Sequence, residues 1–223
     1  MITVHHLNNS RSQRVLWLLE ELGVPYKIQR YQRDKKTYLA PASLKAVHPL
    51  GKSPVLTDGD LTLAESGAII EYLAETYGNN QLAISSTDTA YWQYKYWLHY
   101  AEGSLMPFLI MKMLADRIRR SKVPFFIKPI TKKISSQLLS SYIAPSLQTQ
   151  LAYVDQHLAS HPWFAGNTLS AADFQMSFPL ETAKFGTKGI TEYPNLIRYV
   201  DKIQARPAYQ RALEKGGDYS FAS

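Results

Sequence analysis

Apolar positions in the first 78 residues switch between strand-like and helix-like spacing. A short apolar run over 2–7 predicts a strand, and helical spacing over 12–22 predicts a helix that Gly23 and Pro25 end. Alternation over 26–32 predicts a second strand. This order indicates a βαβ unit at the start of the chain, with Ser12 as the expected N-cap of its helix.

The rest of this half contains a hairpin and a helix. A helical turn is predicted over 43–47, a hairpin forms around Asp58-Gly59, and a final helix carries apolar residues over 69–77 before Gly78. The combined order, βαβ followed by ββα, predicts an α/β thioredoxin-like domain over residues 1–78.

The pattern becomes helical after a polar stretch. Residues 79–86 lack sustained periodicity and are predicted to be a linker, and residues 87–223 are predicted to form an all-α domain. Ser170 and Asp173 have the spacing of a capping box. Prolines 124, 129 and 145 must break or kink the helices that contain them. Helical spacing is found over 91–115, 134–158, 171–183, 194–205 and 207–215.

The amino-acid composition excludes several classes of protein and of catalytic mechanism. The 223 residues are 45% hydrophobic and 19% charged, which is typical of a folded globular protein. No apolar run is long enough to span a membrane, and we expect a cytoplasmic protein. The absence of cysteine excludes disulfides and any mechanism that needs a protein thiol. The six histidines lack metal-ligand spacing, so no metal site is predicted.

Much of the net charge of +7 comes from one basic cluster. Such a cluster suits either nucleic acid or an anionic surface, or it is a solvated helix face. We favour the solvated face and predict no nucleic-acid partner, because no nucleic-acid motif accompanies the charges. The cluster comprises Lys112, Arg117, Arg119, Arg120, Lys122, Lys128, Lys132 and Lys133.

The segment from Gly51 to Ile70 carries the strongest functional signal. The proline in Ser53-Pro54 removes a backbone donor at a strand start, which predicts a cis bond and a free strand edge. On that edge, Val55 would offer its backbone N–H and C=O to an extended peptide. Ser66 opens a helix, where free N–H groups attract a carboxylate. The pattern therefore predicts recognition of a peptide backbone and a carboxylate side by side.

This pairing resembles the glutathione-binding half of the glutathione S-transferase family, and a looser resemblance extends over the whole chain. The resemblance implies glutathione as co-substrate, with Pro54 and Val55 at its backbone. Lys52 would meet the glycyl carboxylate, and Glu65 and Ser66 would hold the γ-glutamyl end. A surface lysine and a simple helix cap are the structural alternatives.

The turn between the first strand and helix carries the expected catalytic group. The family keeps the glutathione thiol as thiolate through a nearby donor, because a hydrogen bond to the anion lowers its pKa. In serine-type members the hydroxyl precedes a helical Arg-Val pair, which matches Ser10 ahead of Arg14-Val15. Asn9 is the nearest rival, and Asn8 and Ser12 are further candidates. A purely structural role of the loop as turn and cap is the alternative. The run over 9–23 resembles a bacterial or fungal subgroup of the serine or asparagine type.

The resemblance also implies a hydrophobic electrophile bound against the helical domain. The expected reaction is conjugation of the glutathione thiolate, typical of detoxification, in a homodimer. Glutathione-dependent reduction of organic hydroperoxides and non-catalytic binding of apolar ligands are the alternatives. Glu102 would approach the γ-glutamyl ammonium from a partner subunit. The candidates for the wall of the second site, which core packing also explains, are Tyr96, Tyr100, Met106, Phe108 and Met111.

Overall fold

The amino-terminal part of the chain is a four-stranded sheet with helices on both faces. The computed structural model describes residues 1–34, 37, 39–79 and 81–222. The sheet order is β2-β1-β3-β4. Strands β1 and β2 are parallel, and the other two pairs are antiparallel. The strands are β1 (Ile2–Leu7), β2 (Tyr26–Tyr31), β3 (Val55–Asp58) and β4 (Leu61–Ala64).

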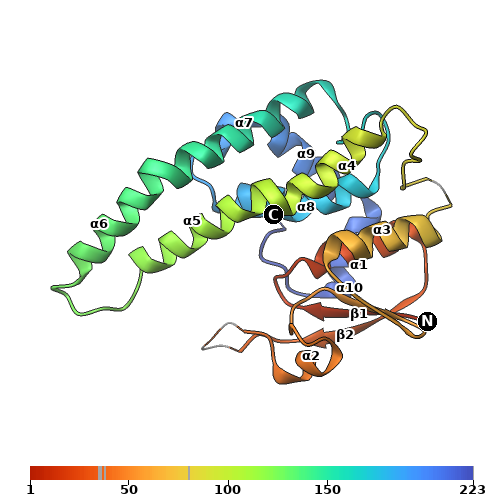
Figure 1. Cartoon of the computed structure of the whole chain (residues 1–223), viewed down its shortest axis with the longest axis horizontal. Helices are drawn as coiled ribbons and strands as arrows, with labels where there is room; N and C mark the ends of the chain where they lie inside the picture. The colour runs from red at the N-terminus through yellow and green to blue at the C-terminus, as the bar shows by residue number, and fades with distance from the viewer. Residues whose placement is uncertain (35–36, 38, 80, 223) are drawn as a thin grey trace.

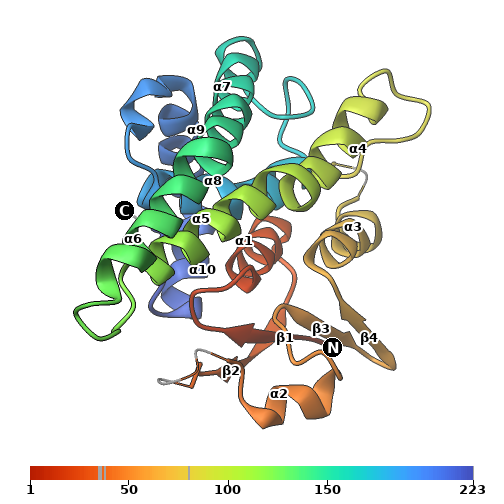
Figure 2. The ribbon, with the colours of Figure 1, turned by 60° about the vertical axis from the view of Figure 1, so that its left-hand side comes forward.

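Helices α1 (Ser12–Leu22) and α3 (Ser66–Tyr77) cover one face, and α2 (Ala42–Val47) covers the other (Figure 2). This is the predicted βαβ-ββα order. Gly23 ends α1 with a φ of 65°, a left-handed conformation that glycine adopts without a Cβ penalty. The N-cap prediction was wrong: Ser12 is the first helical residue, and its N–H is bonded by the Ser10 hydroxyl.

The remainder of the described chain is helical. Pro129 and Pro145 lie in the first turns of α6 and α7, where the missing N–H costs no helical bond. The helices are α4 (Tyr91–Tyr100), α5 (Met106–Arg119), α6 (Lys128–Leu138), α7 (Ala144–Ser160), α8 (Ala171–Gly186), α9 (Pro194–Gln204) and α10 (Pro207–Gly216), with π turns at Ala101–Leu105 and Leu139–Ile143 and a 3-10 turn at Ile190–Glu192. Helices α5 and α6 form a hairpin that projects from the body (Figure 1).

Helix α8 is the buried centre of this half. The predicted capping box is confirmed, because the Ser170 N–H donates to Asp173 Oδ2 at 2.8 Å. Asp173 Oδ1 also accepts from the Phe164 N–H and the Tyr199 hydroxyl, at 3.0 and 2.7 Å. These bonds satisfy a carboxyl that is fully buried, so its role is structural.

The two halves share one core. Trp17 of α1 has no exposed surface and lies 4.2 Å, between ring centroids, from Phe174 of α8. Its ring also meets Tyr209 of α10 edge-on at 5.7 Å. Helix α10 thus returns from the helical half to pack on α1. The expected linker over 79–86 falls between α3 and α4 and includes residue 80, which lies outside the described residues. Across the described ranges, no helix combines the length and apolarity needed to cross a membrane.

Candidate active site

The loop between β1 and α1 holds Ser10 in a network of hydroxyl groups. Ser10 is 5% exposed, and its Oγ lies 2.7 Å from Ser12 Oγ and 3.4 Å from Ser53 Oγ. Ser53 donates to the His5 carbonyl at 2.8 Å, so its hydrogen is already used. The Ser53 oxygen in turn accepts from the Leu7 N–H at 3.2 Å.

A buried histidine fixes the second hydroxyl of this network. Ser12 Oγ lies 2.8 Å from His6 Nδ1, and the other ring nitrogen of His6 is bonded by the Gly216 carbonyl. That carbonyl requires a donor, which assigns the proton to Nε2 and makes Nδ1 the acceptor for the Ser12 hydroxyl. Burial, together with the Arg30 charge, lowers the pKa of His6 to about 4 against the opposing Gly216 bond, so the imidazole is neutral at pH 7. Since Ser12 donates to His6, Ser10 is the donor in the 2.7 Å contact with Ser12, and its hydrogen must turn from that hydroxyl to reach a ligand.

The two asparagines in the same loop have different surroundings. Asn8 Oδ1 accepts from the Arg33 N–H at 3.0 Å. Asn9 has a φ of 50°, and its Oδ1 accepts from the Ser220 N–H at 2.7 Å. Among the residues that the structure describes, none accepts a hydrogen bond from the Asn9 amide nitrogen, so Asn9 stays the rival of Ser10 on chemical grounds.

The Ser53-Pro54 bond is cis, as predicted, but Val55 does not lie on a free strand edge. Strand β3 is interior, and Val55 pairs with His5 on one side and Ala64 on the other. Its N–H and C=O therefore face a neighbouring strand whichever way they point. Within the described residues, no hydrogen bond reaches the backbone N–H or C=O of Ser53, the residue before the proline. The open backbone position is thus two residues earlier than the sequence indicates.

Glu65 and Ser66 occupy the start of α3, as predicted. Glu65 is exposed and has a φ of 70° and a ψ of 114°, a conformation that is uncommon for a residue with a Cβ. Ser66 is buried and is the first helical residue. The turn therefore presents the exposed carboxylate of Glu65 beside the free N–H groups of the helix start.

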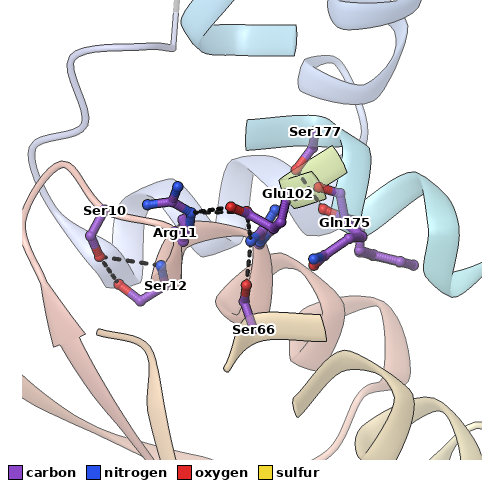
Figure 3. A network of polar contacts seen from close by, with 9 residues as sticks. Ser10, Arg11, Ser12, Ser66, Glu102, Gln175 and Ser177 are labelled. Carbon is purple, nitrogen blue, oxygen red and sulfur yellow. Dashed lines mark hydrogen bonds and ion pairs between the residues drawn. The ribbon is translucent and has the colours of Figure 1, made fainter. Parts of the chain in front are cut away.

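Arg14 links this turn to the helical half by bonding both Ser66 and Glu102, which lie close together in Figure 3. It is 1% exposed, and its guanidinium donates to the Ser66 hydroxyl, to Glu102 Oε1 at 2.6 Å and to the Gln175 carbonyl at 2.5 Å. Glu102 is also bonded by Arg11 Nε at 2.8 Å, within the same chain. Burial favours a higher pKa for Glu102, but the Arg14 and Arg11 charges lower its pKa below the ordinary value. The role of Arg14 was not predicted, although a charged residue among the apolar neighbours of α1 is a sequence signal of a buried ion pair.

Lys52 lies in the loop before the cis peptide and is exposed. Its ammonium can therefore reach a carboxylate bound at this side of the site.

The structure brings together only part of the expected second-substrate wall: the rings of Tyr96 and Tyr100 are in contact, with centroids 5.6 Å apart. Tyr100 and Met106 are buried, and the Tyr100 hydroxyl donates to Gln150. Phe108 is partly buried beside Tyr142, with ring centroids 5.9 Å apart, and Met111 is also partly exposed. Tyr96 and Tyr100 both line a hollow of about 650 Å³ along α4.

A different aromatic group lies near the loop. Phe221, in the segment after α10, meets Phe178 and Phe185 of α8 edge-on, with centroids 5.6 and 5.5 Å apart. Arg11 lies 5.3 Å above the Phe178 ring. Since Ser220 bonds Asn9, this carboxy-terminal segment lies against the loop that carries Ser10. No sequence pattern predicts this contact, because the segment follows the last stretch with helical periodicity.

Comparisons with known proteins identify the chain. The family model for the glutathione S-transferase N-terminal domain matches residues 1–75, and the model for the C-terminal domain matches residues 117–216. Glutathione S-transferase 3 of Schizosaccharomyces pombe is 38% identical over 98% of this chain and 89% of its own length. The chain belongs to the glutathione S-transferase family.

Further glutathione S-transferase relatives agree with this assignment. Glutathione S-transferase 1 of Saccharomyces cerevisiae is 32% identical and covers 96% of this chain and 95% of its own. A crystal structure of a glutathione S-transferase from Actinobacillus pleuropneumoniae has a TM-score of 0.80 and 35% identity, covering 99% of this chain and 94% of its own. The predicted architecture, a thioredoxin-like domain followed by helices, is thereby confirmed, and a glutathione transferase function is supported.

Proposed function

We propose that this glutathione S-transferase binds glutathione in the angle between the Ser10 loop, the Ser53-Pro54 peptide and the start of α3, and that Ser10 stabilises the thiolate. The observation that carries the proposal is the routing of hydrogen bonds around Ser10. Ser53 and Ser12 donate to the His5 carbonyl and the His6 ring, whereas the Ser10 hydrogen is donated to another hydroxyl, that of Ser12, and can turn from it to a bound thiolate.

The remaining contacts follow the shape of the tripeptide. The open N–H and C=O of Ser53, next to buried Pro54 and Val55, suit the cysteinyl backbone, which places the thiol on the side of Ser10. Ser66 and the α3 N-terminus suit the γ-glutamyl carboxylate, and Glu65 suits its ammonium. Lys52 suits the glycyl carboxylate.

The reaction is nucleophilic transfer from sulfur. The thiol loses its proton to solvent, and the Ser10 hydroxyl donates a hydrogen bond to the resulting thiolate. The sulfur electron pair forms the carbon–sulfur bond with the electrophile, and the leaving group departs with its bonding pair. In an addition reaction the adjacent carbon takes up a proton instead.

Hydroperoxide reduction is the second candidate, because the same thiolate serves it. The sulfur attacks the peroxide oxygen, the alcohol leaves, and a second glutathione yields the disulfide and water. The chain has no cysteine, so both thiols must come from glutathione. Binding without turnover is the third outcome.

We also propose a homodimer in which α4 lies at the interface. Trp92 is 78% and Tyr96 is 45% exposed on this helix, and both line the hollow along it. Such apolar exposure is typical of a covered surface. A cytoplasmic location and a division into domains 1–78 and 87–223 belong to the same proposal.

Calorimetry with glutathione, followed by turnover assays with an aryl halide and with an organic hydroperoxide, tests the function. Binding with turnover of the aryl halide supports the proposal. Faster turnover of the hydroperoxide favours the peroxidase, binding alone favours a non-catalytic role, and absence of binding overturns all three.

A further inference from the structure

The positive charge of this protein is concentrated in one projection. Residues 117–154 contain seven arginines and lysines and no aspartate or glutamate. Elsewhere in the chain, 18 basic residues are balanced by 18 acidic ones. The net charge of +7 therefore comes from the α5–α6 hairpin and its continuation into α7. This region is distant in sequence from the loop that carries Ser10.

The end of this hairpin, residues 119–134, is called the basic tip below. It lies at the extremity of the molecule, away from the sheet (Figures 1 and 2). Arg119, Arg120, Lys122, Lys128 and Lys132 are all exposed and line a hollow of about 540 Å³ at the tip. A hollow of this size with guanidinium and ammonium groups around it suits phosphate headgroups.

The same tip exposes apolar side chains. Phe125 and Phe126 are 82% and 64% exposed and meet edge-on, with centroids 5.6 Å apart. Ile130 and Ile134, on the first turns of α6, are 57% and 60% exposed. Aliphatic and aromatic surface between cationic groups, at the end of a projection, matches the boundary between headgroups and acyl chains.

We propose that the basic tip docks the protein on the surface of a bilayer that contains anionic phospholipid. Phe125 and Phe126 enter the headgroup region, and the cationic groups contact lipid phosphates. Nucleic acid offers the same charge, but it offers no hydrocarbon to cover Ile130 and Ile134. The proposal concerns a surface contact and is independent of the glutathione site.

Vesicle flotation of the full chain tests the proposal. We expect binding to phosphatidylcholine vesicles containing roughly 30% phosphatidylglycerol, weak binding to phosphatidylcholine alone, and loss of binding in about 1 M NaCl. The triple variant Arg120→Glu, Lys122→Glu and Lys128→Glu should lower the partition coefficient about 100-fold or more. Phe125→Ser with Phe126→Ser should lower it while keeping the net charge.

Matched charge-reversal variants distinguish the effect of the basic tip from the effect of the net charge. Lys27→Glu, Lys45→Glu and Lys188→Glu change the net charge equally at exposed positions elsewhere and should leave binding within about twofold. All variants should retain the thermal unfolding midpoint and conjugating activity of the parent.

Several results would overturn the proposal. These are equal binding to neutral vesicles, equal loss in the matched control, an oligonucleotide bound in preference to anionic vesicles, and a tip variant that changes only the oligomeric state. Binding of inorganic phosphate at the tip without vesicle binding would also reject it, in favour of a small-anion site.

Discussion

Arg14 and Glu102 join the two halves of the protein next to the glutathione site. Their nearest atoms, Nη2 and Oε1, are 2.6 Å apart, and the same guanidinium donates to the Ser66 hydroxyl. A carboxylate on the helical half thus holds the cation that positions the first residue of α3. Within the chain the Glu102 carboxylate is bonded by Arg14, and its approach to the γ-glutamyl ammonium from a partner subunit stays a prediction.

Glu102→Gln should therefore destabilise the protein and weaken glutathione binding together. Arg14 is buried and would lose its ionic partner, which costs about 2 kcal/mol at this partly exposed pair. Denaturant unfolding and calorimetry with glutathione measure the two effects. Glu214→Gln, at an exposed position, is the control. An unchanged affinity in Glu102→Gln would show that Ser66 does not depend on Arg14 for its position.

Ser10→Ala should raise the pKa of the bound glutathione thiol by about one unit or more, because the anion loses its donor. The affinity for glutathione should change little, since the backbone and carboxylate contacts remain. Ultraviolet titration of the enzyme-bound thiolate gives the pKa. Asn9→Ala is the matched variant, and a shift seen there in place of Ser10→Ala would assign the role to Asn9.

The neutral His6 should make stability depend on pH. Its pKa is lowered from 6.5 to about 4 in the fold, so the unfolded chain binds more protons in that window. Stability is complete above about pH 6.5 and falls by about 3 kcal/mol as the pH decreases to 4. The unfolding free energies of the parent and of His6→Gln are measured at pH 7 and at pH 4.5. The parent should lose this stability relative to His6→Gln between the two pH values. A constant difference would contradict the buried neutral ring.

Glu181 should give the folding stability the opposite dependence on pH. It is 1% exposed, and burial raises its pKa to about 7 against hydrogen bonds from Tyr209, Tyr219 and Gln204. Its folded form binds the extra proton between about pH 4.5 and 7, so its contribution is present below pH 4.5 and is lost as the pH rises to 7. Relative to Glu181→Gln, the parent should lose about 3 kcal/mol between pH 4.5 and 8. Chemical denaturation at the two pH values measures this loss, and a loss of the same size in Glu181→Gln would assign it to other groups.

Phe221→Ala should raise the KM for an apolar electrophile several-fold with little effect on the KM for glutathione. The ring packs on Phe178 and Phe185 beside the Ser10 loop, so it is suited to the wall of the second site. Phe108→Ala is the comparison, because Phe108 was expected in that wall from its helical spacing. Steady-state kinetics with substrates of increasing size distinguish the two positions, and a larger effect of Phe108→Ala would restore the original assignment.

Local patterns predicted the fold well because each depends on neighbouring residues. The cis peptide at Pro54, the turn at Gly59 and the capping box at Ser170 all have signatures within four residues, and all are observed. The interior position of β3 was not predictable in this way, because strand order depends on pairing with β1. The bond from Ser220 to Asn9 joins residues 211 positions apart, and no periodicity indicates such a contact.

The course of the last residues also bears on how the protein is handled in the laboratory. Because Ser220 is bonded to Asn9, a polypeptide fused after Ser223 would begin three residues beyond a contact with the reactive loop and would compete with substrate for space. Kinetic constants measured with an affinity tag at that end would include the effect of the tag on the site.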